Sequence, residues 1–248
     1  MRWRRQSRWL LGVGAVLLAA ALGLLAWLRM MDANANLSPN PADDDWFASL
    51  VSDRSSEEDD GFVEVDWDHW RSVNPDIIAW VNIPDTQVNY PVVRASADDP
   101  TFYLHHDIYG NYSAYGVPYL DADCVSAEVS AFNAIIYGHH MDNGSMFSDI
   151  AEYSNESFAH DHPFIYLQSP TVKQKLAVSF VEIIDAANTP KAIRYESAEA
   201  FQDWFEEHFA SAAVSLETPE EPNYAITFCT CSYHEFSNER TLVVCVPT

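Results

Sequence analysis

Residues 226–246 read ITFCTCSYHEFSNERTLVVCV, the most informative stretch of the sequence. Two runs of β-branched and apolar residues flank a polar loop, which predicts a strand, a loop and a second strand. Cys231 ends the first strand and Arg240 begins the second. Because a hairpin brings such strand ends together, we expect the thiol and the guanidinium to be neighbours, where an arginine favours a thiolate. On spacing alone, a solvated arginine at a strand end is an equally good interpretation.

Further short runs rich in β-branched and aromatic residues, bounded by turn residues, predict more strands upstream of this hairpin. With the hairpin they make eight, at residues 80–84, 88–93, 117–121, 133–138, 163–168, 175–184, 224–231 and 241–246. Eight short strands in one domain favour a closed barrel or a sandwich, because closure removes exposed strand edges. The predicted fold class is therefore mainly β.

Two helices are predicted beside these strands. Residues 64–78 carry apolar residues at helical spacing, although Asn74-Pro75 interrupts the pattern. Residues 197–212, SAEAFQDWFEEHFASA, begin with a serine suited to cap a helix and place aromatic residues on one face. We expect this aromatic face to pack onto the sheet.

The first 60 residues predict a membrane attachment. Four arginines in residues 1–8 precede an uncharged apolar run at 9–28, which is long enough to span a bilayer. Basic residues before the span place the N-terminus in the cytoplasm, and an acidic linker at 29–60 then leads to a domain at 61–248 outside the membrane. A cleaved signal peptide is the alternative, and it exports the same domain.

The charge and the cysteines exclude some classes of protein. A formal net charge of -24 argues against a nucleic-acid partner, which needs clustered Lys and Arg. The acidic surface fits either simple solubility or the attraction of a cationic amine substrate. Four cysteines (Cys124, Cys229, Cys231, Cys245) do not form a regularly spaced framework, so whether any of them pair stays open.

Histidines at the end of a predicted strand are candidate partners for a nucleophilic cysteine. Residues 133–147, NAIIYGHHMDNGSMF, predict a strand that ends at a glycine and is followed by His139 and His140. A cysteine nucleophile needs such an acid/base group, although the doublet does not show which histidine serves. Zinc ligation by these histidines with Cys229 and Cys231 is disfavoured, because a single Cys-x-Cys is a weak zinc signature.

At these same residues the sequence resembles the sortases, and class B sortases in particular. The family motif Thr-Leu-x-Thr-Cys followed by an arginine is similar to TFCTC at 227–231 with Arg240, and the Gly-His motif is similar to 138–139. Two departures are Phe228 in place of the usual leucine and His140 where class B members often have asparagine. The resemblance extends through the first strands, at 74–93 and 102–121, and covers about residues 62–246.

The resemblance implies a fold and a set of roles. The fold would be an eight-stranded sortase barrel with an N-terminal helical extension and a helix between the sixth and seventh strands. Cys231 would be the nucleophile that forms a thioester, and His139 the general acid and later the base. Arg240 would stabilise the oxyanion, and Thr230 would support the substrate through its backbone. No cofactor and no metal is expected.

The implied activity is that of a cysteine transpeptidase, which cuts a C-terminal sorting signal of a surface protein and joins it to an amine. The acceptor would be a peptidoglycan precursor or a pilin lysine. Because no second apolar span follows the last strand, we expect cell-wall anchoring, with pilin polymerisation as the alternative. A sortase-like binding module without catalysis and a hydrolytic cysteine peptidase are the other readings. The enzyme would sit in the cell membrane with its catalytic domain outside.

Overall fold

The chain is described here from a computed structural model, which covers residues 61–94, 96, 98–125, 132–216, 221–232 and 238–248. The predicted basic tail (1–8), membrane span (9–28) and linker (29–60) lie outside these ranges and stay predictions. Within the described ranges, none of the helices combines the length and the apolar character that a membrane crossing needs.

All eight predicted strands form. They are β1 (Ile77–Asn82), β2 (Asn89–Arg94), β3 (Tyr119–Leu120), β4 (Asn133–Tyr137), β5 (Phe164–Gln168), β6 (Lys173–Asp185), β8 (Ala225–Cys231) and β9 (Glu239–Pro247). A two-residue strand that was not predicted, β7 (Val214–Ser215), pairs with β6. The short helical pieces are η1 (Phe102–Leu104), η2 (Ala122–Val125), α4 (Ser148–Glu152) and α5 (Glu156–Asp161).

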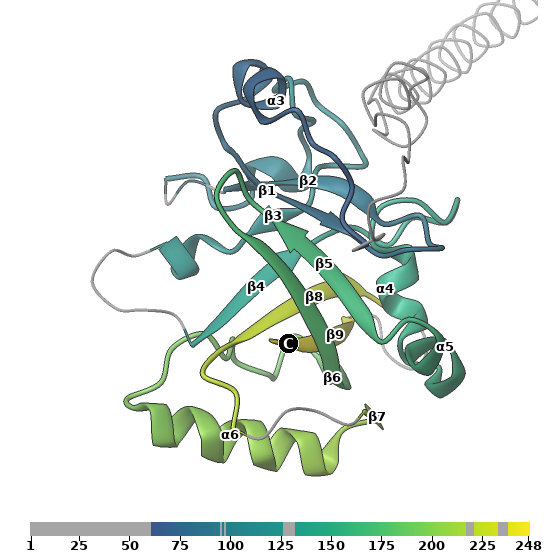
Figure 1. The fold of residues 1–248 in the computed structure, drawn as a ribbon, viewed down its shortest axis with the longest axis vertical. Helices are drawn as coiled ribbons and strands as arrows, with labels where there is room; N and C mark the ends of the chain where they lie inside the picture. Colours follow the sequence, from purple (N-terminus) through teal and green to yellow (C-terminus); the bar gives the residue numbers. More distant parts are fainter. Residues whose placement is uncertain (1–60, 95, 97, 126–131, 217–220, 233–237) are drawn as a thin grey trace, which may run out of the picture. The chain divides into compact units, whose positions relative to one another are not determined.

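The sheet closes on itself into a barrel (Figure 1). The strand order is β5-β1-β2-β3-β4-β8-β9-β6, and the additional pairing of β5 with β6 completes the ring, with β7 outside it. Two of the pairings, β2 with β3 and β4 with β8, are parallel. The predicted choice between barrel and sandwich is therefore settled in favour of the barrel.

The first predicted helix is shorter than expected. The helix α3 spans Trp67–Val73 instead of 64–78, and β1 begins already at Ile77. The side chain of Asp66 caps its start, and Asn74 ends it in an extended conformation just before Pro75. The Asn74 side chain donates to the Tyr103 hydroxyl (2.9 Å) and to the Ile108 carbonyl (3.0 Å). Pro75 disfavours the helical conformation at Asn74, and these tertiary hydrogen bonds hold the extended residue in place.

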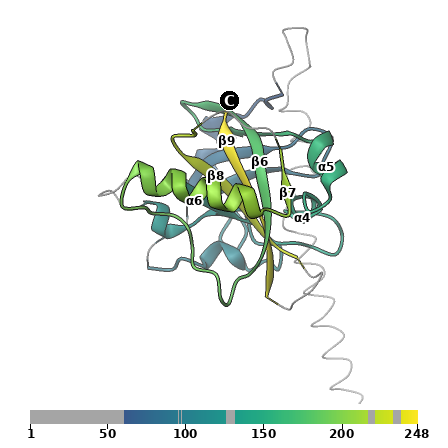
Figure 2. The ribbon, with the colours of Figure 1, turned by 90° about the horizontal axis from the view of Figure 1, so that it is seen from below.

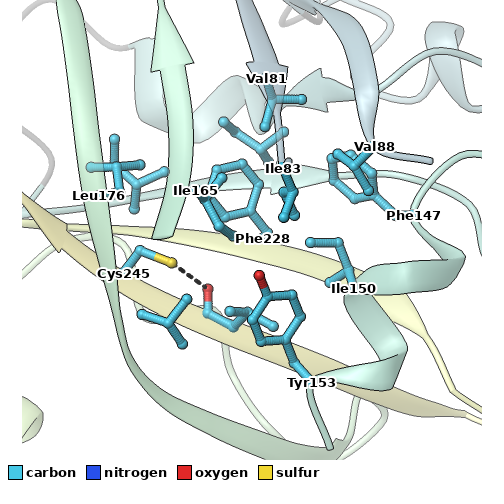
Figure 3. Packing of buried hydrophobic residues seen from close by; sticks show 14 of the residues in the cluster. Val81, Ile83, Val88, Phe147, Ile150, Tyr153, Ile165, Leu176, Phe228 and Cys245 are labelled. Carbon is cyan, nitrogen blue, oxygen red and sulfur yellow. Dashed lines mark hydrogen bonds between the residues drawn. The ribbon is translucent and has the colours of Figure 1, made fainter. Parts of the chain in front are cut away.

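The barrel interior is filled by apolar side chains from nearly every strand (Figure 3). Phe228 from β8 is fully buried there and packs against Phe147 with ring centroids 6.1 Å apart. Successive strand residues point to opposite faces, so Phe228 faces inward while Cys229 lies outside, in a second cluster with Ile135 and Ile193. The outer face of β4 and β8 is therefore a separate packed surface.

The second predicted helix is confirmed. The helix α6 spans Ala198–Ser211 between β6 and β7, and the Ser197 hydroxyl caps it by accepting from the Ala200 N–H. Figure 2 shows α6 lying over β6, β8 and β9. Its buried residues Phe201 and Phe205 pack against the outer face of the sheet, where Phe180 lies.

Candidate active site

The candidate nucleophile lies at the end of a strand and faces the candidate arginine. In the antiparallel pair of β8 and β9, Cys231 is the direct cross-strand partner of Arg240. The predicted pairing of the two strand ends is therefore present in the backbone. Cys231 is half-buried and its thiol is free. It shares the outer face of β8 with Cys229, which is buried two residues earlier.

The candidate acid/base group follows the strand next to β8. Because β4 runs parallel to β8 and Tyr137 is paired with Cys229, the chain that leaves β4 reaches the end of β8. The Gly138 N–H donates to the Cys229 carbonyl (3.1 Å), and the Thr230 hydroxyl donates to the Gly138 carbonyl (2.9 Å). The backbone of His139 therefore lies beside the end of β8, the strand that carries Cys231.

A single hydrogen bond fixes the tautomer of His139. Its Nε2 lies 2.8 Å from the carbonyl oxygen of Leu104, at the end of η1. A carbonyl can only accept, so Nε2 carries the proton and donates it. In the neutral ring the lone pair is then on Nδ1, which makes Nδ1 the basic atom.

The surroundings of His139 keep it neutral. Burial is the largest effect and lowers the pKa of the imidazole, the hydrogen bond to Leu104 opposes this, and the charges of His105 and Arg240 lower it further. The His105 ring lies 6.0 Å from the His139 ring, centroid to centroid. A neutral imidazole at neutral pH is suited to take a proton from a thiol.

Arg240 and Thr230 lie on opposite sides of the same strand pair. Arg240 is half-buried on the outer face, and its guanidinium donates to the carbonyl of Glu239 (2.9 Å). Thr230 lies on the inner face of β8, like Phe228, with 1% of its surface exposed, and its hydroxyl donates to the Gly138 carbonyl. The Thr230 side chain thus holds β4 against β8; its predicted backbone role toward substrate stays a prediction.

In the comparison with known protein families, a model described as the sortase domain matches residues 81–248. The chain belongs to the sortase family. A relative named Sortase B from Listeria monocytogenes is 29% identical over 160 residues, which is 63% of this chain and 64% of that protein. This sortase thus matches somewhat less than two thirds of that relative's length.

Solved structures of sortase B share the fold of this sortase. The Staphylococcus aureus sortase B–substrate complex superposes with a TM-score of 0.64 at 21% identity, covering 73% of this chain and 84% of the other. A structure of sortase B complexed with triglycine gives a TM-score of 0.65 at 21% identity, with coverage of 73% and 84%. At this level of identity the likeness shows the fold.

The second histidine of the doublet contacts the nucleophile's backbone in this sortase. The Nδ1 atom of His140 lies 2.9 Å from the carbonyl oxygen of Cys231. The sequence pattern did not separate the two histidines, whereas their hydrogen bonds give them different surroundings.

As for a metal, no group of three or more His, Cys, Asp or Glu side chains suited to hold one occurs among the residues that the structure describes.

Sequence reasoning missed an ion pair beside the site. Asp121, just after β3, is buried, and its carboxylate lies 2.7 Å from the Lys191 ammonium. Burial of Lys191 opposes its charge, but Asp121 and Asp123 outweigh that effect and raise its pKa. Lys191 belongs to the segment between β6 and α6, in which Ile193 covers Cys229. The only signal in the sequence was that a lysine is unusual in so acidic a chain.

Proposed function

We propose that this chain is a class B-type sortase: a cysteine transpeptidase that cleaves a sorting signal, holds the new C-terminus as a thioester and passes it to an amine. The observation that carries the proposal is the cross-strand pairing of Cys231 with Arg240, together with the position of His139 directly after Gly138, whose N–H donates to the Cys229 carbonyl. The basic Nδ1 of His139 is not the nitrogen that bonds Leu104. Membership of the sortase family supports the same chemistry.

In the first half of the reaction, Nδ1 of neutral His139 accepts the proton of the Cys231 thiol as the sulfur attacks the scissile carbonyl. The carbonyl oxygen gains negative charge, and the Arg240 guanidinium on the neighbouring strand stabilises it. When the tetrahedral intermediate collapses, the peptide C–N bond breaks. The imidazolium returns its proton to the leaving amine, and a thioester remains on Cys231.

In the second half, an acceptor amine attacks the thioester and His139 takes the proton that the nitrogen loses. The C–S bond breaks, and the proton passes to the sulfur, which restores the thiol and the neutral imidazole. A partly buried site favours the amine over water, because the acceptor brings binding energy of its own. No cofactor is needed for any of these steps.

The cellular setting is part of the proposal. Residues 9–28 would anchor the enzyme in the cell membrane with its N-terminus in the cytoplasm, and the acidic linker at 29–60 would hold the catalytic domain outside. Substrates would be surface proteins with a C-terminal sorting signal, and the acceptor amine would belong to the cell wall. The solved sortase B structures, one with a substrate and one with triglycine, support these classes of partner.

The test uses the full chain in detergent with a panel of short sorting-signal peptides, each with and without an amine acceptor such as triglycine. Intact mass spectrometry follows the wild type and Cys231→Ala in parallel. We expect an acyl adduct on the wild type, no adduct on the variant, and faster loss of the adduct with the amine as an amide product appears.

The outcomes separate the alternatives. An adduct that is released equally fast with and without amine would identify a hydrolytic cysteine peptidase. Products joined through a pilin lysine in preference to a wall-type amine would favour pilus assembly. The absence of any adduct, while Cys231 still reacts with a thiol reagent, would contradict the transpeptidase on that panel and favour a binding module.

A further inference from the structure

The parallel ladder between β4 and β8 reaches the nucleophile through an unusual final bond. In a parallel pair, every second residue of one strand donates its backbone N–H to every second carbonyl of the other. The last pairing of the strands is Tyr137 with Cys229, and the Gly138 N–H donates to the Cys229 carbonyl (3.1 Å). A continued ladder would next place the N–H of residue 140 on the carbonyl of Cys231.

The backbone leaves β8 before that bond forms. His140 makes an antiparallel bridge with Met146, and the His139 carbonyl accepts from the Phe147 N–H (2.8 Å). The chain after Gly138 thus folds back on its own following segment. The Cys231 carbonyl would lose its partner at this point, yet it accepts a hydrogen bond of 2.9 Å from the imidazole Nδ1 of His140. The side chain of His140 occupies the place in the ladder that its own backbone has left.

We propose that His140 is a positioning residue for Cys231: its Nδ1–H donates to the Cys231 carbonyl and fixes the end of β8 that carries the nucleophile. The role rests on the proposed function, since it concerns the placement of the thiol for acyl transfer. His140 donates a hydrogen bond and exchanges no proton with substrate, so a neutral donor of suitable length can replace it.

The two consecutive histidines each donate a hydrogen bond to a different backbone carbonyl. His139 donates through Nε2 to the Leu104 carbonyl and keeps Nδ1 as its basic atom, whereas His140 donates through Nδ1 to Cys231. Because the two residues are joined by one peptide unit, the segment that presents the base also holds the backbone of the nucleophile. The relative placement of base and thiol then depends on the His140 bond, and small misplacements of reacting groups are costly in rate.

The chain offers a matched control. His162 also bonds through Nδ1 to a carbonyl, that of Phe158 (3.0 Å), at the C-terminal end of α5. His162→Leu therefore removes the same kind of bond from another part of the fold. We compare it with His140→Leu, which removes the donor from the site, and with His140→Asn, which keeps a donor. All variants are made in the full chain. Each is assayed at a temperature at which its thermal melt shows it to be folded.

We expect His140→Leu to lower kcat by about tenfold or more with KM changed by less than about threefold, as for a group that positions the reacting atoms. His140→Asn should stay within about threefold of the wild type, and His162→Leu should change neither constant. Wild-type kcat in His140→Leu, a loss confined to KM, or equal damage from Asn and Leu would each overturn the proposal.

Two readouts do not depend on peptide transfer. In ¹⁵N spectra of the histidine rings, His140 should carry its proton on Nδ1 and His139 on Nε2, and a neutral His140 protonated only on Nε2 would refute the bond. Alkylation of Cys231 by iodoacetamide, corrected with Cys231→Ala, should be several-fold slower in His140→Leu and unchanged in His162→Leu. Equal alkylation rates would contradict the positioning role even if the chain transferred no peptide.

Discussion

Replacing Lys191 should destabilise the fold more than replacing its ion-pair partner Asp121. The Asp121 side chain keeps 5% of its surface exposed, whereas that of Lys191 keeps 53%. Lys191→Met therefore leaves a buried carboxylate without its counter-charge, while Asp121→Asn leaves an ammonium that water reaches. Removing one partner of a fully buried pair costs about 3–5 kcal/mol. With half of the lysine solvated and the Asp123 N–H still bonded to Asp121, we expect about 2 kcal/mol for Lys191→Met.

Asp121→Asn should cost at most about 1 kcal/mol, because it removes the charge that is expensive to bury. Urea unfolding followed by tryptophan fluorescence measures both, since Trp70 and Trp80 are buried. In a domain of this size, Lys191→Met should lower Tm by about 4–8 °C. The double variant should be more stable than Lys191→Met alone. The reasoning is refuted if Asp121→Asn is the more damaging single change, or if the double variant loses more than the two singles together.

Three further results are expected. In Gly138→Ala the new Cβ would lie 2.5 Å from the buried Phe147 ring, so we expect a loss of about 1–3 kcal/mol in unfolding free energy, and an unchanged melt would show that the ring can yield. Because the pKa of His139 is lowered, thioester formation should persist as the pH falls to about 6.5 and decline only below it, as the neutral base is protonated; a decline that starts above this value would contradict the assignment. Phe201→Ala should cost about 3–5 kcal/mol in a thermal or urea melt, because this ring of α6 is fully buried against the sheet, and a small loss would mean that the helix repacks.

Local sequence pattern was sufficient for most of the fold. The strands and α6 could be predicted because their apolar periodicity and caps act over a few residues, as Ser197 does at the start of α6. The helix predicted at 64–78 was too long, although Asn74-Pro75 already interrupts its pattern locally. Trp70 and Ile77 have helical spacing, but Asn74 is extended before Pro75, and its side chain bonds residues about thirty positions away, which no local pattern could indicate.

The candidate site also contains features that the local sequence predicts and features that it does not. The pairing of Cys231 with Arg240 follows from one hairpin, so it could be predicted from a short stretch of sequence. The difference between His139 and His140 could not, because it depends on the carbonyls of Leu104 and Cys231, which belong to distant parts of the chain. The Lys191 contact with Asp121 is equally remote in sequence.

The parallel contact of β4 with β8 has a consequence for when the site comes into existence. The His140–Cys231 hydrogen bond joins residues 91 positions apart, and all of β5, β6 and α6 lie between them in the chain. Pairings between residues so far apart in sequence are slow to form, because closing the large loop between them costs entropy before any stabilising contact is made. On refolding we therefore expect the pairing of Cys231 with Arg240, which closes only a short loop, to form before the pairing of β8 with β4. Acyl transfer would therefore require the closed barrel, because only the pairing of β4 with β8 brings the two histidines to the end of β8.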